Sequence, residues 1–215
     1  DANREHMVMP GMVYLSQPTE YGALYTCAEL TAISAVCRAG GVPLYLDGAR
    51  LAYALACSTN DVMLTDIARL ADAFYIGGTK CGALFGEAVV FPQKNTVPHF
   101  FSIVKQHGAL LAKGRIAGLQ FDTLFTDRLY EKGGATAIHA ADRIRAVLKA
   151  KGYRLAFESP TNQIFLLLDE AQKSRLENDV ELGFWEKLPD GTTVMRIATS
   201  WATQDADVDR LAALL

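Results

Sequence analysis

The chain contains the stretch Phe74-Tyr75-Ile76-Gly77-Gly78-Thr79-Lys80-Cys81-Gly82, a short apolar run that ends in a glycine-lined turn. A second stretch, Pro43-Leu44-Tyr45-Leu46-Asp47-Gly48-Ala49-Arg50, has the same form and ends its apolar run on Asp47. Short apolar runs bounded by turn residues are typical of strands buried in a parallel sheet. The two stretches therefore predict two strands, each leading into a turn that carries a charged side chain.

The residues before and between these strands complete two βαβ units. Residues 12–15 form another apolar run. Thr26 and Glu29 form a capping box that opens a helix, and Gly40-Gly41 ends it. A helical stretch over residues 65–71 precedes the strand at 73–76. We expect three parallel strands from this alternation.

The fourth strand, residues 88–91, begins soon after Lys80. A parallel crossover needs about a dozen residues or more, so this strand is expected to run antiparallel. The prediction is an α/β fold with a mixed, mostly parallel sheet.

The second half of the chain has a different character. Residues 100–125 look helical but interrupted by glycines, and residues 135–150 form an amphipathic helix. Strands separated by polar segments follow, and a last helix begins near Asp205; the strands are 154–157, 163–168, 181–186 and 193–199. We expect residues 1–130 to be part of a large domain and residues 131–215 to form a small C-terminal α+β domain.

The composition is that of an ordinary globular protein. Of 215 residues, 50% are hydrophobic and 21% are charged, and the net charge is −3. This balance gives no electrostatic reason to expect a nucleic-acid or membrane partner. The four cysteines have neither zinc-site nor disulfide-framework spacing, so no metal is expected. The first residues lack the apolar segment of a signal peptide, and a cytoplasmic location is expected.

The strand ends bring candidate catalytic residues to one edge of the sheet. Gln17, Asp47 and Lys80 each follow the carboxyl end of a predicted parallel strand, where such sheets bind ligands. A lysine amine that forms a Schiff base, and a carboxylate that keeps a pyridine nitrogen protonated, are what pyridoxal phosphate (PLP) requires. The alternatives are that Lys80 is a surface lysine and that Asp47 caps the next helix or pairs with Arg50.

Other candidates have competing interpretations. Arg50 has the planar donors that suit a carboxylate clamp, but it could instead pair with Asp47. Arg196 lies within a predicted strand, where a buried charge must be paired, so a structural salt bridge is the favoured interpretation from the residues alone. The turn at Lys80 lacks the spacing of a nucleotide P-loop. Cys81 is expected to be a packing residue and Trp201 a core residue.

Four stretches resemble the low-specificity L-threonine aldolase family, which belongs to the aromatic amino acid β-eliminating lyase/threonine aldolase group of PLP enzymes with the aspartate aminotransferase-type fold. They are residues 45–50, 77–80, 86–91 and 196–201. The resemblance implies that Lys80 is the Schiff-base lysine and Asp47 the ring-nitrogen partner. It also implies that Arg50 and Arg196 hold the substrate carboxylate, that Thr79 lies near the cofactor phosphate, and that Gln17 occupies a turn near the ring hydroxyl.

The resemblance further implies a lyase that cleaves L-threonine or L-allo-threonine to glycine and an aldehyde, working as a homodimer or homotetramer. A β-eliminating lyase or an aminotransferase would use the same lysine and aspartate, and a non-catalytic binding module is a third alternative. No glycine-rich phosphate loop is recognisable in residues 1–46. We therefore expect the chain to be the C-terminal part of a larger enzyme.

Overall fold

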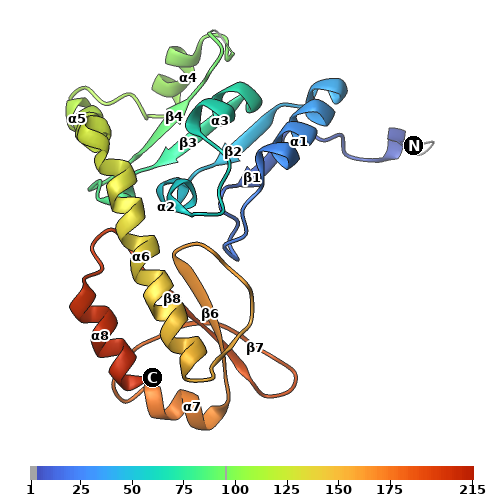
Figure 1. The fold of residues 1–215 in the computed structure, drawn as a ribbon. Helices are drawn as coiled ribbons and strands as arrows, with labels where there is room; N and C mark the ends of the chain where they lie inside the picture. Colours follow the sequence, from blue (N-terminus) through green and yellow to red (C-terminus); the bar gives the residue numbers. More distant parts are fainter. Residues whose placement is uncertain (1–3, 95) are drawn as a thin grey trace.

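The computed structural model describes residues 4–94 and 96–215, which form two four-stranded sheets connected by a long helix (Figure 1). A short 3-10 helix, Arg4–His6, precedes the first strand. None of the helices in the described part of the chain is both long and apolar enough to cross a membrane.

The first sheet has the strand order β1-β2-β3-β4. Strands β1 (Val13–Ser16), β2 (Leu44–Asp47) and β3 (Ala73–Gly77) are parallel, and β4 (Glu87–Val90) is antiparallel to β3. The predicted mixed sheet is confirmed, including the reversal at β4.

Three helices connect the parallel strands: α1 (Cys27–Gly40), α2 (Leu51–Ala56) and α3 (Leu64–Leu70). The capping box at Thr26 is present, and Gly41 ends α1 with a φ of 65°. Helix α2 was not predicted. Because the strands advance in one direction and such crossovers are right-handed, the helices cover one face of the sheet. Leu44 and Leu46 are buried on that face, and the residues that alternate with them, Tyr45 and Asp47, point to the other face.

The predicted interrupted helix is two helices, α4 (Phe100–Gln106) and α5 (Arg115–Phe125), and Gly118 lies inside α5 without breaking it. Two short 3-10 helices lie at Thr79–Cys81 and Thr126–Arg128. Helix α6 (Leu129–Ala150) begins earlier than predicted and continues through Gly134. A Cβ on Gly134 would lie 2.3 Å from the carbonyl oxygen of Ala52, so this glycine allows α6 to approach α2.

The second sheet is antiparallel, with the order β5-β6-β8-β7. Its strands are β5 (Arg154–Leu155), β6 (Gln163–Leu168), β7 (Gly183–Lys187) and β8 (Thr193–Ala198). Helix α8 (Asp205–Leu214) packs with α6 against β6 and β8 in a second hydrophobic core, and α7 (Glu170–Leu176), which was not predicted, follows β6.

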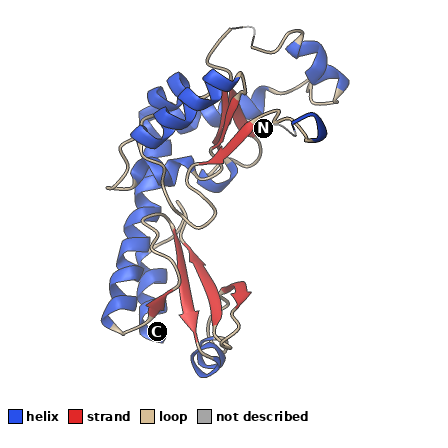
Figure 2. Ribbon diagram, turned by 90° about the vertical axis from the view of Figure 1, so that its right-hand side faces the viewer, coloured by secondary structure: helices blue, strands red, loops and turns tan. Residues whose placement is uncertain are grey.

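Helix α6 contributes to both cores, since its first half packs with α2 and its second half with β6 (Figure 2). The predicted domain boundary between residues 130 and 131 falls near the beginning of this helix.

Candidate active site

Two glycines bring the turn after β2 against the end of β3. A Cβ on Gly48 would lie 2.1 Å from the carbonyl oxygen of Tyr75, and a Cβ on Gly77 would lie 2.3 Å from the carbonyl oxygen of Ala49. The Gly77 N–H donates to the Gly48 carbonyl at 2.9 Å. Neither position has room for a side chain. The two glycines therefore allow the turns that carry Asp47 and Lys80 to touch each other at the same edge of the sheet.

Asp47 ends β2 and is partly buried, on the face opposite the helices. Its Oδ1 accepts from the Ala49 N–H at 2.8 Å and from the Tyr75 hydroxyl, and its Oδ2 accepts from the Tyr14 hydroxyl. Burial alone would raise the pKa of Asp47, but these hydrogen bonds and the charge of Lys80 hold the pKa below its ordinary value. The carboxylate is therefore ionised at neutral pH.

Lys80 is exposed, in a turn fixed by two side chains. The buried Tyr53 of α2 donates its hydroxyl hydrogen to the Lys80 carbonyl oxygen. Glu87, at the start of β4, accepts from the Gly78 N–H at 2.6 Å and from the Thr79 hydroxyl at 2.9 Å. The residues just before Lys80 and the Lys80 carbonyl are thus held in place. Among the described residues, the Lys80 amine forms no ion pair.

Gln17 is 1% exposed, and the oxygen and the nitrogen of its side-chain amide both form hydrogen bonds with the backbone of Tyr25. The Tyr25 N–H donates to Oε1 at 2.9 Å, and Nε2 donates to the Tyr25 carbonyl at 3.1 Å. Gln17 therefore shapes the loop after β1 rather than presenting a free polar group.

Arg50 and Arg196 approach one region from the two sheets. Arg50 Nη1 lies 3.6 Å from the carboxylate of Glu20, whose side chain is 65% exposed. The backbone carbonyl of Glu20 accepts from Gln163 Nε2 at 3.0 Å, and Gln163 Oε1 accepts from Arg196 Nη1 at 3.2 Å. Glu20 and Gln163 thus connect the two arginines.

The two arginines have different partners. Arg50 pairs with Glu20 and not with Asp47. Arg196 forms no salt bridge within residues 4–94 and 96–215; it donates to a neutral amide and stacks on Trp185, with its guanidinium carbon 5.3 Å from the ring centre. Among the described residues, neither guanidinium is paired with a buried carboxylate, so both remain suited to an anionic ligand.

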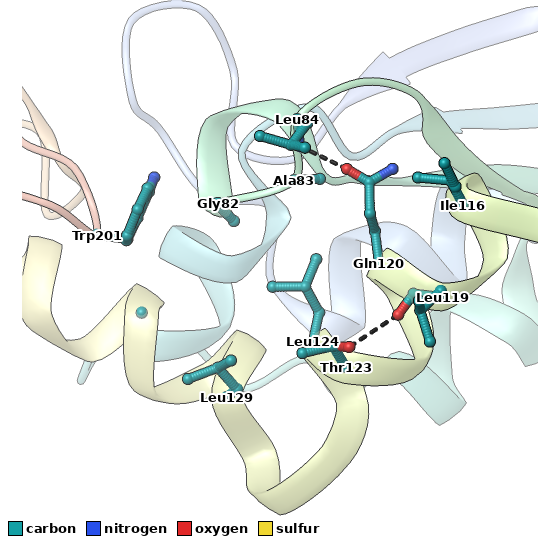
Figure 3. A pocket seen from close by; sticks show the side chains of 12 residues that line it. Gly82, Ala83, Leu84, Ile116, Leu119, Gln120, Thr123, Leu124, Leu129 and Trp201 are labelled. Atoms are coloured by element: carbon teal, nitrogen blue, oxygen red, sulfur yellow. Dashed lines mark hydrogen bonds between the residues drawn. The ribbon is translucent and has the colours of Figure 1, made fainter.

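An apolar pocket of about 420 Å³ opens next to the Lys80 turn (Figure 3). Residues 81–84 form one wall, α5 and the start of α6 another, and the ring of Trp201 faces it. Trp201 is 48% exposed, so its predicted core position is wrong. Cys81 is buried, and burial raises the pKa of its thiol to about 11, which agrees with a packing residue.

These residues fit PLP. The amine of Lys80 and the ionised carboxylate of Asp47 share one sheet edge, and Asp47 keeps one acceptor position on Oδ2 that no described residue fills. Thr79 belongs to the same turn, although its hydroxyl donates to Glu87. No group of three or more metal-ligating side chains occurs in the described residues.

Sequence reasoning missed the groups that hold these residues: Tyr14, Tyr53, Tyr75, Glu20 and Glu87. One signal was available, because each predicted parallel strand has a tyrosine near its middle, at positions 14, 45 and 75. The contacts of Glu20, Glu87 and Tyr53 depend on how loops and helices fold back, which periodicity does not reveal.

The sequence has relatives with assigned activities. It is 34% identical over 212 residues to the low specificity L-threonine aldolase of Pseudomonas sp., covering 97% of this chain and 60% of the relative. It is also 34% identical over 170 residues to the low specificity L-threonine aldolase of Pseudomonas aeruginosa, covering 77% of this chain and 48% of the relative. The chain therefore spans about half to three fifths of the length of these curated relatives.

Solved structures agree with the predicted fold class. The threonine aldolase of Leishmania major is 46% identical and superimposes with a TM-score of 0.94, covering 98% of this chain and 61% of that one. A putative L-allo-threonine aldolase from Listeria monocytogenes, 19% identical with a TM-score of 0.75, shares the fold; the match covers 98% of this chain and 62% of that one.

The model of the Beta-eliminating lyase family matches residues 1–185, which include both strand-end turns and Lys80. This chain belongs to the Beta-eliminating lyase family, as the resemblance in its sequence indicated.

Proposed function

We propose that the protein is a PLP-dependent carbon–carbon lyase that cleaves L-threonine or L-allo-threonine to glycine and acetaldehyde by retro-aldol cleavage. The observation that carries the proposal is the pair formed by Lys80 and ionised Asp47 at one sheet edge. Arg50 follows Asp47 in the same turn, and Arg196 is linked to Arg50 through Glu20 and Gln163. The identity to L-threonine aldolases and the family membership support the same reaction class.

Each residue would have a definite task. Lys80 would attach the cofactor covalently through its amine, and Asp47 would keep a proton on the ring nitrogen. Bound PLP supplies an electron sink for the electron pair that is released when the Cα–Cβ bond breaks. Thr79 would contribute to the phosphate end, and Gln17 would shape the loop beside the ring. Cleavage moves the β-hydroxyl proton off the substrate and returns a proton to Cα, so threonine gives one glycine and one acetaldehyde.

Arg50 and Arg196 would bind the substrate carboxylate. Arg50 is only 16% exposed, but its partner Glu20 is 65% exposed and lies 3.6 Å away. A single long contact to a solvated carboxylate holds Arg50 weakly, so a substrate carboxylate can displace Glu20. The guanidinium of Arg196 lies over the ring of Trp185 and donates to the neutral amide of Gln163. Two planar donors fix the orientation of the amino acid and hence of the bond that breaks.

We also propose that residues 1–130 belong to the cofactor-binding domain, that residues 131–215 form the small domain, and that the protein is a homodimer or homotetramer. Support for assembly comes from exposed large apolar side chains along α4 and α5, including Phe101, Ile116 and Leu119. All four cysteines are free, which is compatible with the proposed cytoplasmic location. Light scattering of the full-length protein measures the assembly.

The test of the activity is Lys80→Ala in the full-length protein, with Lys149→Ala as the control. Lys149 is an exposed lysine at the far end of α6. Lys80→Ala should abolish both the visible absorbance of bound PLP and acetaldehyde release from L-threonine, and Lys149→Ala should change neither. Normal turnover by Lys80→Ala would refute the assignment of this lysine.

A further inference from the structure

Three tyrosines lie side by side on the sheet face that carries Asp47. Tyr14, Tyr45 and Tyr75 come from the adjacent parallel strands β1, β2 and β3. The rings of Tyr14 and Tyr45 stack with centres 5.5 Å apart, and the centres of Tyr45 and Tyr75 are 6.3 Å apart. The register explains the row, since Tyr14 pairs with Tyr45, and Leu46 pairs with Phe74, which sets Tyr75 beside Asp47.

Only the outer two hydroxyls reach the carboxylate. Tyr14 donates to Oδ2 of Asp47, and Tyr75 donates to Oδ1, which also accepts from the Ala49 N–H. Within residues 4–94 and 96–215, Tyr45 donates no hydrogen bond to Asp47. The three rings are thus chemically alike but differ in whether they bond to Asp47.

Among the described residues, the donors to Asp47 leave one acceptor position of its carboxylate open. An ionised carboxylate offers about four lone-pair positions on its two oxygens. The two tyrosine hydroxyls and the Ala49 N–H fill three of them, two on Oδ1 and one on Oδ2. One position on Oδ2 is left for a further donor.

Both hydroxyls remain donors at neutral pH. The hydrogen bond to Asp47 raises the pKa of Tyr14 to about 12, and burial together with the bond to Asp47 raises the pKa of Tyr75. Lys80 is the charged group that also lowers the pKa of Asp47, whereas Tyr45 is acted on by Asp47: burial and then the Asp47 charge raise the pKa of Tyr45. Two neutral donors and one cation therefore favour the ionised form of the carboxyl over the effect of its burial.

We propose that Tyr14 and Tyr75 are positioning residues that hold Asp47 as an oriented carboxylate with one acceptor position directed to the ring N–H of the cofactor. This inference rests on the proposed function, because it concerns how the same site holds the pyridine nitrogen of PLP. The two tyrosines act through Asp47 and need not touch the substrate.

The first test uses the cofactor-free, full-length protein. The variants are Tyr14→Phe, Tyr75→Phe and the double variant, with Tyr45→Phe as the matched control that removes a hydroxyl from the same row. Carbon-13 NMR of the labelled Asp47 carboxyl, followed over pH, measures its pKa. The pKa should rise in each single variant and rise further in the double variant, while Tyr45→Phe leaves it unchanged. Circular dichroism checks that all four variants fold.

The second test measures the Kd of PLP for the same variants by absorbance titration. The double variant should bind PLP at least about tenfold more weakly than wild type, because it lacks both of the tyrosine hydrogen bonds that orient the carboxylate. Tyr45→Phe should bind as wild type does.

The outcomes separate the two proposals. An unchanged Asp47 pKa in the double variant, or an equal shift in Tyr45→Phe, overturns the positioning role even where wild type binds PLP and cleaves threonine. Failure of wild type to bind PLP overturns the proposed function. It also overturns the role of Tyr14 and Tyr75 in directing Asp47 to the cofactor ring, whatever the NMR titration gives.

Discussion

Tyr53 donates its hydroxyl hydrogen bond to the carbonyl oxygen of Lys80, which ties helix α2 to the turn that carries the candidate catalytic lysine. Helix α2 begins directly after Arg50, in the turn that follows Asp47. One short helix therefore fixes both strand-end turns relative to each other. Tyr53 is 1% exposed, so the hydroxyl that holds the Lys80 turn belongs to a side chain fixed in the hydrophobic core.

Tyr53→Phe should lower the free energy of unfolding by about 1–2 kcal/mol, because it removes a buried hydrogen bond. It should also weaken PLP binding, since the Lys80 turn loses a support. The control is Tyr130→Phe, which removes an equally buried hydroxyl that accepts from the Ala52 N–H at 3.1 Å. Urea unfolding should show that both variants are destabilised, and PLP titration should show a higher Kd only for Tyr53→Phe. Equal Kd values for the two variants would contradict the link to Lys80.

Gly134→Ala should destabilise the protein by about 1–3 kcal/mol, the range for overpacking a close contact. The added Cβ would lie 2.3 Å from the Ala52 carbonyl oxygen, so α6 and α2 would have to separate. Gly118→Ala is the control within α5, where a Cβ meets nothing within 4 Å. It should stabilise the protein by about 0.5–1 kcal/mol through helix propensity. Thermal unfolding measures both, and a neutral Gly134→Ala would contradict the close packing of α6 on α2.

The stability contributed by Asp47 should be lost in acid. The pKa of Asp47 in the folded protein lies below the ordinary value of about 4. A depressed carboxyl pKa stabilises the folded state fully above the unfolded pKa, and this stabilisation disappears as pH falls through the folded pKa. The stability advantage of wild type over Asp47→Asn should therefore be present at about pH 6 and shrink below about pH 4. Urea unfolding over pH tests this, and an advantage that grows in acid would contradict it.

Arg196→Lys should raise the KM for L-threonine at least about tenfold while changing kcat less. A tetrahedral ammonium cannot form the two-pronged bond to a carboxylate and has no planar face to lay on Trp185. Arg154→Lys, an exposed position on β5 of the same sheet, is the control and should behave as wild type. Steady-state kinetics decide the point. Equal KM values in the two variants would remove Arg196 from the substrate site.

The sequence predicted the first sheet well because each strand there is a short apolar run with clear turn residues at its end. The reversal at β4 could be predicted from the length of the connection alone, because too few residues separate Lys80 from β4 for a parallel crossover. Helices α2 and α7 were missed because they are short and lack an amphipathic pattern: α2 (LAYALA) is apolar all round, and α7 (EAQKSRL) is mostly polar. The early start of α6 was missed because Gly133 and Gly134 look like a helix end, whereas Gly134 is required by the contact with Ala52.

The candidate site was predictable only in part. Asp47 and Lys80 could be paired because parallel strands bring their carboxyl ends to one edge. Their roles, and those of Arg50, Arg196, Thr79 and Gln17, stay predictions. The partners of these residues, such as Glu20 for Arg50 and Glu87 for Thr79, come from side-chain contacts between loops and strand ends that no periodic pattern encodes.

The most direct test of the central claim is to incubate the purified full-length protein with PLP and L-threonine and to measure the carbon products. Acetaldehyde is followed by an NADH-linked alcohol dehydrogenase, and glycine is quantified in the same samples. Retro-aldol cleavage predicts equimolar glycine and acetaldehyde with no added keto acid, and no product from Lys80→Ala. Ammonia with 2-oxobutanoate would indicate β-elimination, and turnover that requires a keto acid would indicate transamination; either result would contradict the proposed reaction.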